Sequence, residues 1–189
     1  MKINKDTLKQ TWLYKHCRNF FMWPIDFYYW YPKHLKWLLM AFQKNCMIDP
    51  CSRTRAKIWK VCGVDTTGRF NVGFDVYFDA QNAKHIHIED GVWISSRCTI
   101  LCHKRDISHY HIGDIYTNNP PKVADVRICK NAAIGMESMI MPGVTICEGA
   151  VIGSGSLVTK DIPAWSIAMG RPAKVIRFLD PKDQNSFDE

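Results

Sequence analysis

The chain has 189 residues, of which 47% are hydrophobic and 23% are charged, and it carries a net charge of +7. This composition is that of a folded globular protein and excludes a disordered or low-complexity chain. The length is sufficient for one substantial domain with a short additional segment.

The positive charge and the aromatic residues are concentrated at the N-terminus. Residues 1–57 contain 11 Lys/Arg against 3 Asp/Glu, a balance of +8, and 12 of the 23 aromatic residues. Leu35–Phe42 and Arg53–Lys60 are candidate amphipathic helices. Two interpretations stay open: a cap that covers the end of the following domain, or peripheral contact with an anionic membrane surface or a lipid-linked acceptor. The segment has no nucleic-acid-binding motif, so we expect no such partner.

The eight cysteines do not predict a disulfide framework. The chain shows no secretory leader, and no C-x-x-C pair supports a structural zinc site. We therefore expect reduced thiols in a cytoplasmic protein and no metal.

A six-residue repeat is the strongest pattern in the sequence. From residue 128 an aliphatic side chain recurs at every sixth position, as Ile128, Ile134, Ile140, Ile146, Ile152 and Val158. A second, mostly small residue follows each of them by four positions. This period fits neither an α-helix nor an isolated strand. It predicts a parallel β-helix, in which the chain turns a corner every six residues and each triangular coil buries its aliphatic side chains against its neighbours.

The same period runs earlier in the chain, through Ile88, Ile94 and Ile100. Counting back by sixes extends it to Asn82, Val76, Phe70, Val64 and Ile58. The gap from Ile100 to Ile128 is four residues longer than a multiple of six, so we expect residues 103–124 to leave the β-helix as an excursion loop. The predicted organisation is a cap segment at 1–57, a β-helix at 58–177 and a tail at 178–189.

The segment Ile134–Arg177 resembles the C-terminal signature of hexapeptide-repeat acetyltransferases. The similar enzymes are the maltose and galactoside O-acetyltransferases and those that acetylate nodulation factors and surface polysaccharides. The resemblance covers roughly residues 58–177 and implies a left-handed parallel β-helix, homotrimers with active sites between subunits, and acetyl transfer from acetyl-CoA to a hydroxyl. By analogy we expect a sugar acceptor, a precursor of capsule, lipopolysaccharide or exopolysaccharide. We expect the enzyme in the cytoplasm or at the inner face of the membrane.

Acyl transfer to a hydroxyl requires a base of near-neutral pKa close to the acceptor, and histidine is the natural choice. His103 stands where the repeat breaks, and the resemblance implies the general base at this place. Cys102 precedes it, where sugar-modifying relatives often have Thr or Ser. His109 and His111, in the same excursion, are candidate acceptor contacts, and Asp106 is a candidate to contact the acceptor or to orient a histidine.

The resemblance also implies residues that bind acetyl-CoA. Two of them contact the pantetheine arm from the coils, two lie beside the arm and phosphates, and two lie near the nucleotide phosphates, where cations suit the ligand. In that order they are Met136 and Ser154, Thr159 and Lys160, and Lys174 and Arg177.

Two alternatives stay open. A γ-type carbonic anhydrase shares the β-helix and binds a metal through three histidines, and His103, His109 and His111 are close in sequence. Against this, Lys160 and the run 172–174 belong to the acetyltransferase signature. The second alternative is a catalytically silent β-helix that serves as an assembly platform. His85 and His87, at the start of one repeat, are interpreted as surface residues.

Overall fold

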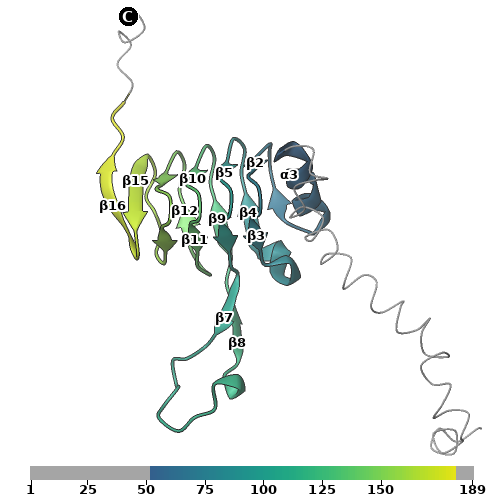
Figure 1. Cartoon of the computed structure of the whole chain (residues 1–189), viewed down its shortest axis with the longest axis vertical. Coiled ribbons are helices and arrows are strands. Elements are labelled where there is room, and N and C mark those ends of the chain that lie inside the picture. Colours follow the sequence, from purple (N-terminus) through teal and green to yellow (C-terminus); the bar gives the residue numbers. More distant parts are fainter. Residues whose placement is uncertain (1–51, 182–189) are drawn as a thin grey trace, which may run out of the picture. The chain divides into compact units, whose positions relative to one another are not determined.

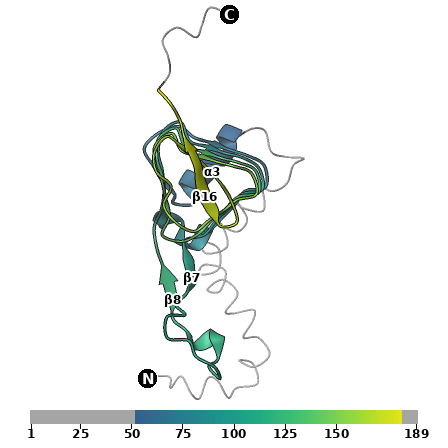
Figure 2. The same ribbon diagram turned by 90° about the vertical axis from the view of Figure 1, so that its left-hand side faces the viewer.

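The computed structural model describes residues 52–181, so most of the predicted cap segment, including Leu35–Phe42, and the end of the tail lie outside the described residues. Three sheets form the sides of a triangular prism, which Figure 2 shows end-on. The first sheet contains β1 (Asp65–Thr66), β4 (Ile86–Ile88), β9 (Val126–Ile128) and β12 (Thr145–Ile146). The second contains β2 (Asn71–Val72), β5 (Trp93–Ile94), β10 (Ala133–Ile134), β13 (Val151–Ile152), β15 (Ser166–Gly170) and β16 (Ala173–Phe178). The third contains β3 (Tyr77–Phe78), β6 (Thr99–Ile100), β11 (Met139–Ile140) and β14 (Leu157–Val158).

The strands of these three sheets pair in parallel, except that β16 runs antiparallel to β15. Each short strand turns one side chain outward and one inward, and the inward one is the aliphatic residue of the repeat. Ile134, for example, lies between Ile94 and Ile152 and is fully buried. The six-residue period therefore produces three stacks of aliphatic side chains along one core, which confirms the predicted parallel β-helix.

The predicted register of the first coil was wrong. Val72 pairs with Ile94 and Phe78 with Ile100, so each partner lies 22 residues away rather than 18. The four additional residues lie in a 3-10 helix, η1 (Ala80–His85), which includes Asn82. Val64, Phe70 and Val76 are buried, but they occupy the second position of the repeat and not the aliphatic one.

The break between Ile100 and Ile128 is confirmed as an excursion. β7 (His103–Arg105) and β8 (Pro121–Val123) form an antiparallel hairpin that projects from the prism, with a short 3-10 helix, η2 (Tyr116–Asn118), near its far end (Figure 1). The Ala124 N–H donates to the Cys102 carbonyl at 2.9 Å and closes the base of the hairpin. The hairpin thus starts from a fixed corner of the β-helix.

Helix α3 (Ser52–Val61) corresponds to the helix predicted at Arg53–Lys60, and it lies across the N-terminal end of the β-helix (Figure 1). Its Trp59 is fully buried, with the ring centroid 4.4 Å from that of Phe78 and 6.1 Å from that of Phe70. These aromatic rings fill the open end of the first coil, and a cap formed by the whole segment 1–57 stays a prediction. None of the helices within residues 52–181 has the length and apolar content needed to cross a bilayer.

Candidate active site

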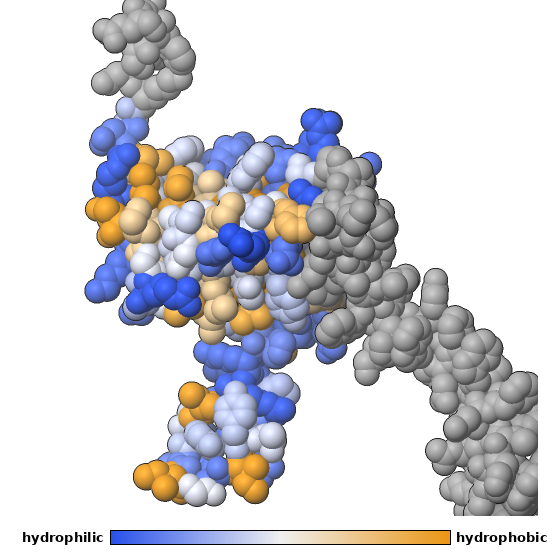
Figure 3. Space-filling view, viewed as in Figure 1, coloured by the Kyte–Doolittle hydropathy of each residue, from blue (hydrophilic) through white to orange (hydrophobic). Residues whose placement is uncertain are grey.

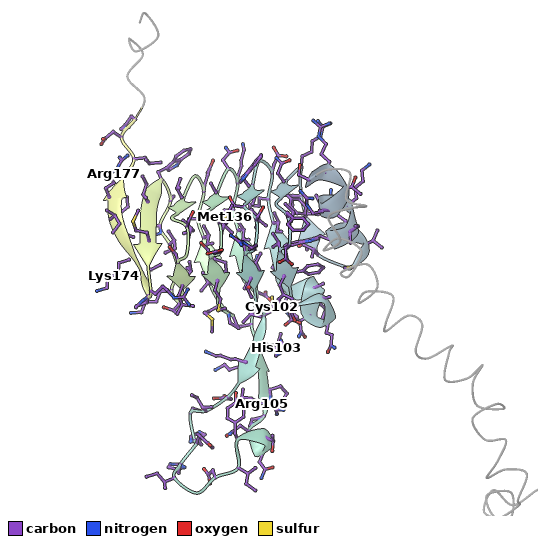
Figure 4. The ribbon with its side chains drawn as sticks, viewed as in Figure 1. Cys102, His103, Arg105, Met136, Lys174 and Arg177 are labelled. Carbon is purple, nitrogen blue, oxygen red and sulfur yellow. The ribbon has the colours of Figure 1, made fainter. Side chains whose placement is uncertain are left out.

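A histidine and a buried carboxylate meet at the base of the hairpin. His103 is the first residue of β7, and its side chain is half exposed. Its Nδ1 forms a hydrogen bond with Oδ2 of Asp79, whose side chain is only 4% exposed. The Asn82 side-chain amide donates to the same carboxylate oxygen at 2.9 Å and lies 3.4 Å from His103 Nδ1. Figure 4 shows His103 where the hairpin leaves the β-helix.

Coil stacking brings these residues together. The pairing of β3 with β6 places Phe78 beside Ile100, and the Asp79 N–H donates to the Ile100 carbonyl at 3.1 Å. Asp79 therefore lies one coil away from the start of the hairpin, although it is 24 residues from His103 in sequence. The 3-10 helix η1 follows Asp79 directly and places the Asn82 side chain against the same carboxylate.

The arrangement favours one tautomer of the neutral imidazole ring. A carboxylate at Nδ1 favours the tautomer with its proton on Nδ1, which leaves the lone pair of Nε2 free to accept a proton. The half-exposed ring makes Nε2 accessible to a substrate hydroxyl. The pair therefore has the geometry of a general base with an orienting carboxylate.

Cys102 and Tyr77, which lie beside this pair, are kept neutral. Burial and, to a smaller extent, the negative charge of Asp79 raise the pKa of the Cys102 thiol to about 12. Burial, and then Asp79, also raises the pKa of Tyr77. A buried thiol that remains protonated is a poor nucleophile. The chemistry available at this corner is therefore that of the histidine.

Asp79, and not Asp106, is the carboxylate that contacts His103 in the structure, and an acceptor contact by Asp106 remains a prediction. Asp106 accepts a hydrogen bond from the Ser108 N–H at 3.1 Å and lies 3.9 Å from the Lys122 ammonium, and the Ser108 hydrogen bonds lower the pKa of its carboxyl group. The sequence analysis missed both Asp79 and Asn82. The signal that would have found them is the 22-residue coil, which places Asp79 beside the residues that precede His103.

His109 and His111 lie in the loop beyond β7 and are exposed. The His111 N–H donates to the Asp114 carboxylate at 2.7 Å, so this part of the loop is held by its own contacts. The far end of the hairpin also exposes several large aliphatic and aromatic side chains, of which the aliphatic ones are orange in Figure 3. They are Ile107, Tyr110, Ile112, Ile115 and Tyr116. A role for either histidine in acceptor binding remains a prediction.

The residues implied for the pantetheine arm lie on two corners of the β-helix. Met136 and Ser154 stack on the corner after the second sheet, where the Gly155 N–H donates to the Met136 carbonyl at 2.7 Å. Thr159 and Lys160 follow β14 on the next corner, the one from which the hairpin leaves. Two coil spacings separate Thr159 from the start of the hairpin, a distance of roughly 10 Å.

Lys174 and Arg177 lie on β16, at the C-terminal end of the β-helix, and both are exposed. Figure 4 shows them several coils away from His103. One chain therefore brings His103 near Asp79 and onto the same corner as Thr159 and Lys160, but does not bring it near the two cations of β16.

A second group of histidines lies at the end of η1 and in β4 of the first sheet. His85 Nδ1 is 2.7 Å from Asp125 Oδ1, and His87 Nδ1 is 2.8 Å from Asp65 Oδ2. Both rings are partly buried, so the predicted surface location is correct only in part. Within residues 52–181 no group of three or more His, Cys, Asp or Glu side chains is suited to hold a metal ion.

Comparison with known proteins agrees with this fold. Residues 125–160 match the family described as bacterial transferase hexapeptide (six repeats). The galactoside O-acetyltransferase of Escherichia coli (strain K12) is 34% identical over 102 residues, which cover 54% of this chain and 48% of that enzyme. A relative from Staphylococcus aureus (strain Mu50 / ATCC 700699) is 38% identical over 130 residues, 58% of this chain and 63% of its own. The chain thus spans between about half and two thirds of the length of these relatives.

Solved structures show the same architecture. A maltose O-acetyltransferase from Clostridium difficile 630 matches with a TM-score of 0.60 and 24% identity, over 78% of this chain and 86% of that one. A galactoside acetyltransferase in complex with coenzyme A matches with a TM-score of 0.56 and 26% identity, over 77% and 79%. The chain has the hexapeptide-repeat, left-handed β-helix fold that its sequence predicted, and it is similar to the maltose and galactoside O-acetyltransferases.

Proposed function

We propose that the protein is an O-acetyltransferase that moves the acetyl group of acetyl-CoA to a sugar hydroxyl. The observation that carries this proposal is the His103–Asp79 pair at the base of the hairpin, a half-exposed base held by a buried carboxylate. The similarity to a galactoside acetyltransferase that binds coenzyme A supports the choice of donor. Its similarity to sugar O-acetyltransferases supports the choice of acceptor class.

In the proposed mechanism, Nε2 of His103 accepts the proton of the acceptor hydroxyl as the hydroxyl oxygen attacks the thioester carbonyl carbon. The Asp79 carboxylate stabilises the imidazolium that forms. The tetrahedral intermediate then collapses, the carbon–sulfur bond breaks, and the imidazolium returns its proton to the coenzyme A thiolate. General base catalysis of this kind contributes about 10²–10⁴-fold to the rate.

Acetyl-CoA is proposed to lie along the coils, with the cations at its phosphate end. Backbone groups of Met136 and Ser154, together with Thr159 and Lys160, would contact the pantetheine arm and the first phosphates. Lys174 and Arg177 would meet the nucleotide phosphates.

We propose a homotrimer in which each active site lies between two subunits. Two features of the single chain support this assembly: His103 lies far from the cations of β16, and the hairpin exposes a group of apolar side chains at its far end. A neighbouring subunit would supply the missing part of the site and cover apolar surface. The proposed acceptor is a precursor of a surface polysaccharide, modified in the cytoplasm or at the inner face of the membrane.

The test is acetyl transfer from acetyl-CoA to a panel of sugars and nucleotide-sugars. His103→Ala should reduce transfer by about 10²–10⁴-fold while acetyl-CoA still binds. Lys130→Ala, at an exposed corner, is the control variant and should keep the wild-type rate. If His103→Ala retains its rate, His103 is not the base. If the wild-type chain does not bind acetyl-CoA, the acetyltransferase proposal fails.

A further inference from the structure

A basic pocket lies between α3 and the turn that joins β1 to β2, at a different corner of the β-helix from His103. Its volume is about 460 Å³. The described residues in its wall include four cations, Arg53, Lys57, Lys60 and Arg69. The other described wall residues are Ala56, Gly68, Phe70 and Asn71, so none of the described wall residues carries a carboxylate.

The helix and the turn contribute opposite walls. Arg53, Lys57 and Lys60 are spaced by four and three residues along α3, which places them on one face of the helix. Arg69 comes from the turn, where its N–H is held by the Asp90 carboxylate at 2.7 Å. The Lys60 ammonium donates to the Gly68 carbonyl at 3.3 Å and joins the two walls. The cations are thus set around the pocket by backbone elements on both sides.

The charged ends of the four pocket cations are not paired with described carboxylates, and Asp90 contacts the wall through the Arg69 backbone N–H. No ion pair between described residues includes any of its four cations. Arg53 and Lys57 are one helical turn apart, and like charges at this spacing destabilise a helix. Arg55 on the same helix behaves differently, because its Nε donates to the Val72 carbonyl at 2.8 Å and ties α3 to the first coil. The helix therefore uses one arginine for packing and directs a cationic face into the pocket.

We propose that this pocket binds a multiply charged phosphate, such as a diphosphate group. Two guanidinium groups can each form paired hydrogen bonds with phosphate oxygens, and the two ammonium groups add point charges. The Asn71 amide supplies a further donor, and the buried ring of Phe70 closes the floor. The volume is that of a small-ligand site. The same phosphate chemistry can come from a soluble phosphorylated compound or from a lipid headgroup at a membrane surface.

The proposal is tested with the full-length protein and two probes. Binding of inorganic pyrophosphate is measured by calorimetry, and binding to vesicles by co-sedimentation, with phosphatidylglycerol against pure phosphatidylcholine. The pocket variant is Lys57→Gln/Arg69→Gln. The control variant, Lys84→Gln/Lys130→Gln, removes the same charge from exposed positions outside the pocket wall.

For a soluble phosphate ligand, the pocket variant should bind pyrophosphate at least ten-fold more weakly than wild type, while the control variant is unchanged. For a lipid headgroup, the pocket variant alone should lose the preference for phosphatidylglycerol vesicles. Equal behaviour of the two variants with both probes would overturn the proposal, because the effect would then come from net charge alone. Acetyl-CoA binding is measured in parallel and should be equal in wild type and pocket variant, so failure of this proposal is separable from failure of the acetyltransferase proposal.

Discussion

Replacement of Asp79 by asparagine tests what the carboxylate contributes to catalysis while the proposed base, His103, is kept. Asparagine has nearly the same shape, so the side chain can still lie against Asn82 and His103, but the negative charge is lost. Hydrogen bonds to a charged group contribute about 1.5–3 kcal/mol. If the whole of this contribution stabilises the imidazolium in the transition state, kcat should fall by roughly 10- to 150-fold, at 1.36 kcal/mol for each ten-fold change.

The assay compares kcat and KM for acetyl-CoA in wild type, Asp79→Asn and Asn82→Ala. A positioning role predicts a lower kcat for Asp79→Asn with KM for acetyl-CoA within about two-fold, because the carboxylate acts only through His103. Asn82→Ala should have a smaller effect, since it removes one neutral donor to the carboxylate. The melting temperature is the control for folding. A kcat within two-fold of wild type, or a loss that follows the melting temperature instead, would refute the proposed role of Asp79.

Three further predictions concern stability and reactivity. Ile134→Ala should lower the free energy of unfolding, measured by urea titration, by about 2–5 kcal/mol, because this side chain is fully buried between two stacked coils. A loss below about 1 kcal/mol would contradict this packing. In the folded protein Cys102 should resist alkylation by iodoacetamide at pH 8, because a pKa of about 12 keeps its thiol protonated. In urea the same thiol should react. Rapid labelling of Cys102 in the native protein, detected by peptide mapping, would contradict this prediction. Gly149→Ala should destabilise the fold more than Gly155→Ala. Both glycines have a positive φ, which costs about 1–2 kcal/mol for an L-residue. Only at Gly149 would the new Cβ also lie 2.4 Å from the Trp165 ring. Equal losses in the two glycine variants would argue against this contact.

The part of the fold with an uninterrupted repeat was predictable from sequence alone. From Ile128 to Val158 each hexad adds one side of a coil, so position along the chain translates directly into position in the prism. The first coil was not predictable in this way, because η1 inserts four residues and shifts the count without breaking the alternation of buried residues. Val64 and Phe70 are buried in either register, so hydrophobicity could not distinguish the two.

Of the candidate site, the position of His103 was predictable from sequence, but its partner Asp79 was not. His103 follows the last regular repeat before the break, a local signal that needs no knowledge of neighbouring coils. Asp79 becomes its partner only through stacking across one coil, and that relation depends on the length of η1. The roles proposed for Lys174 and Arg177 depend on a neighbouring subunit, and no property of a single sequence specifies that arrangement.

The two ends of the β-helix also bear on solubility. A stack of parallel strands presents unpaired N–H and C=O groups at its terminal coils, and such an edge can add further strands from another molecule without limit, as in a fibril. At one end, α3 blocks this growth by placing Trp59 and a helical backbone over the first coil. At the other end, on the side formed by the second sheet, β16 reverses direction against β15, so a strand from a second molecule would meet an antiparallel ribbon there instead of another parallel coil. A chain cut just after β14 would lose this reversal, and filamentous self-association is the failure to expect from it.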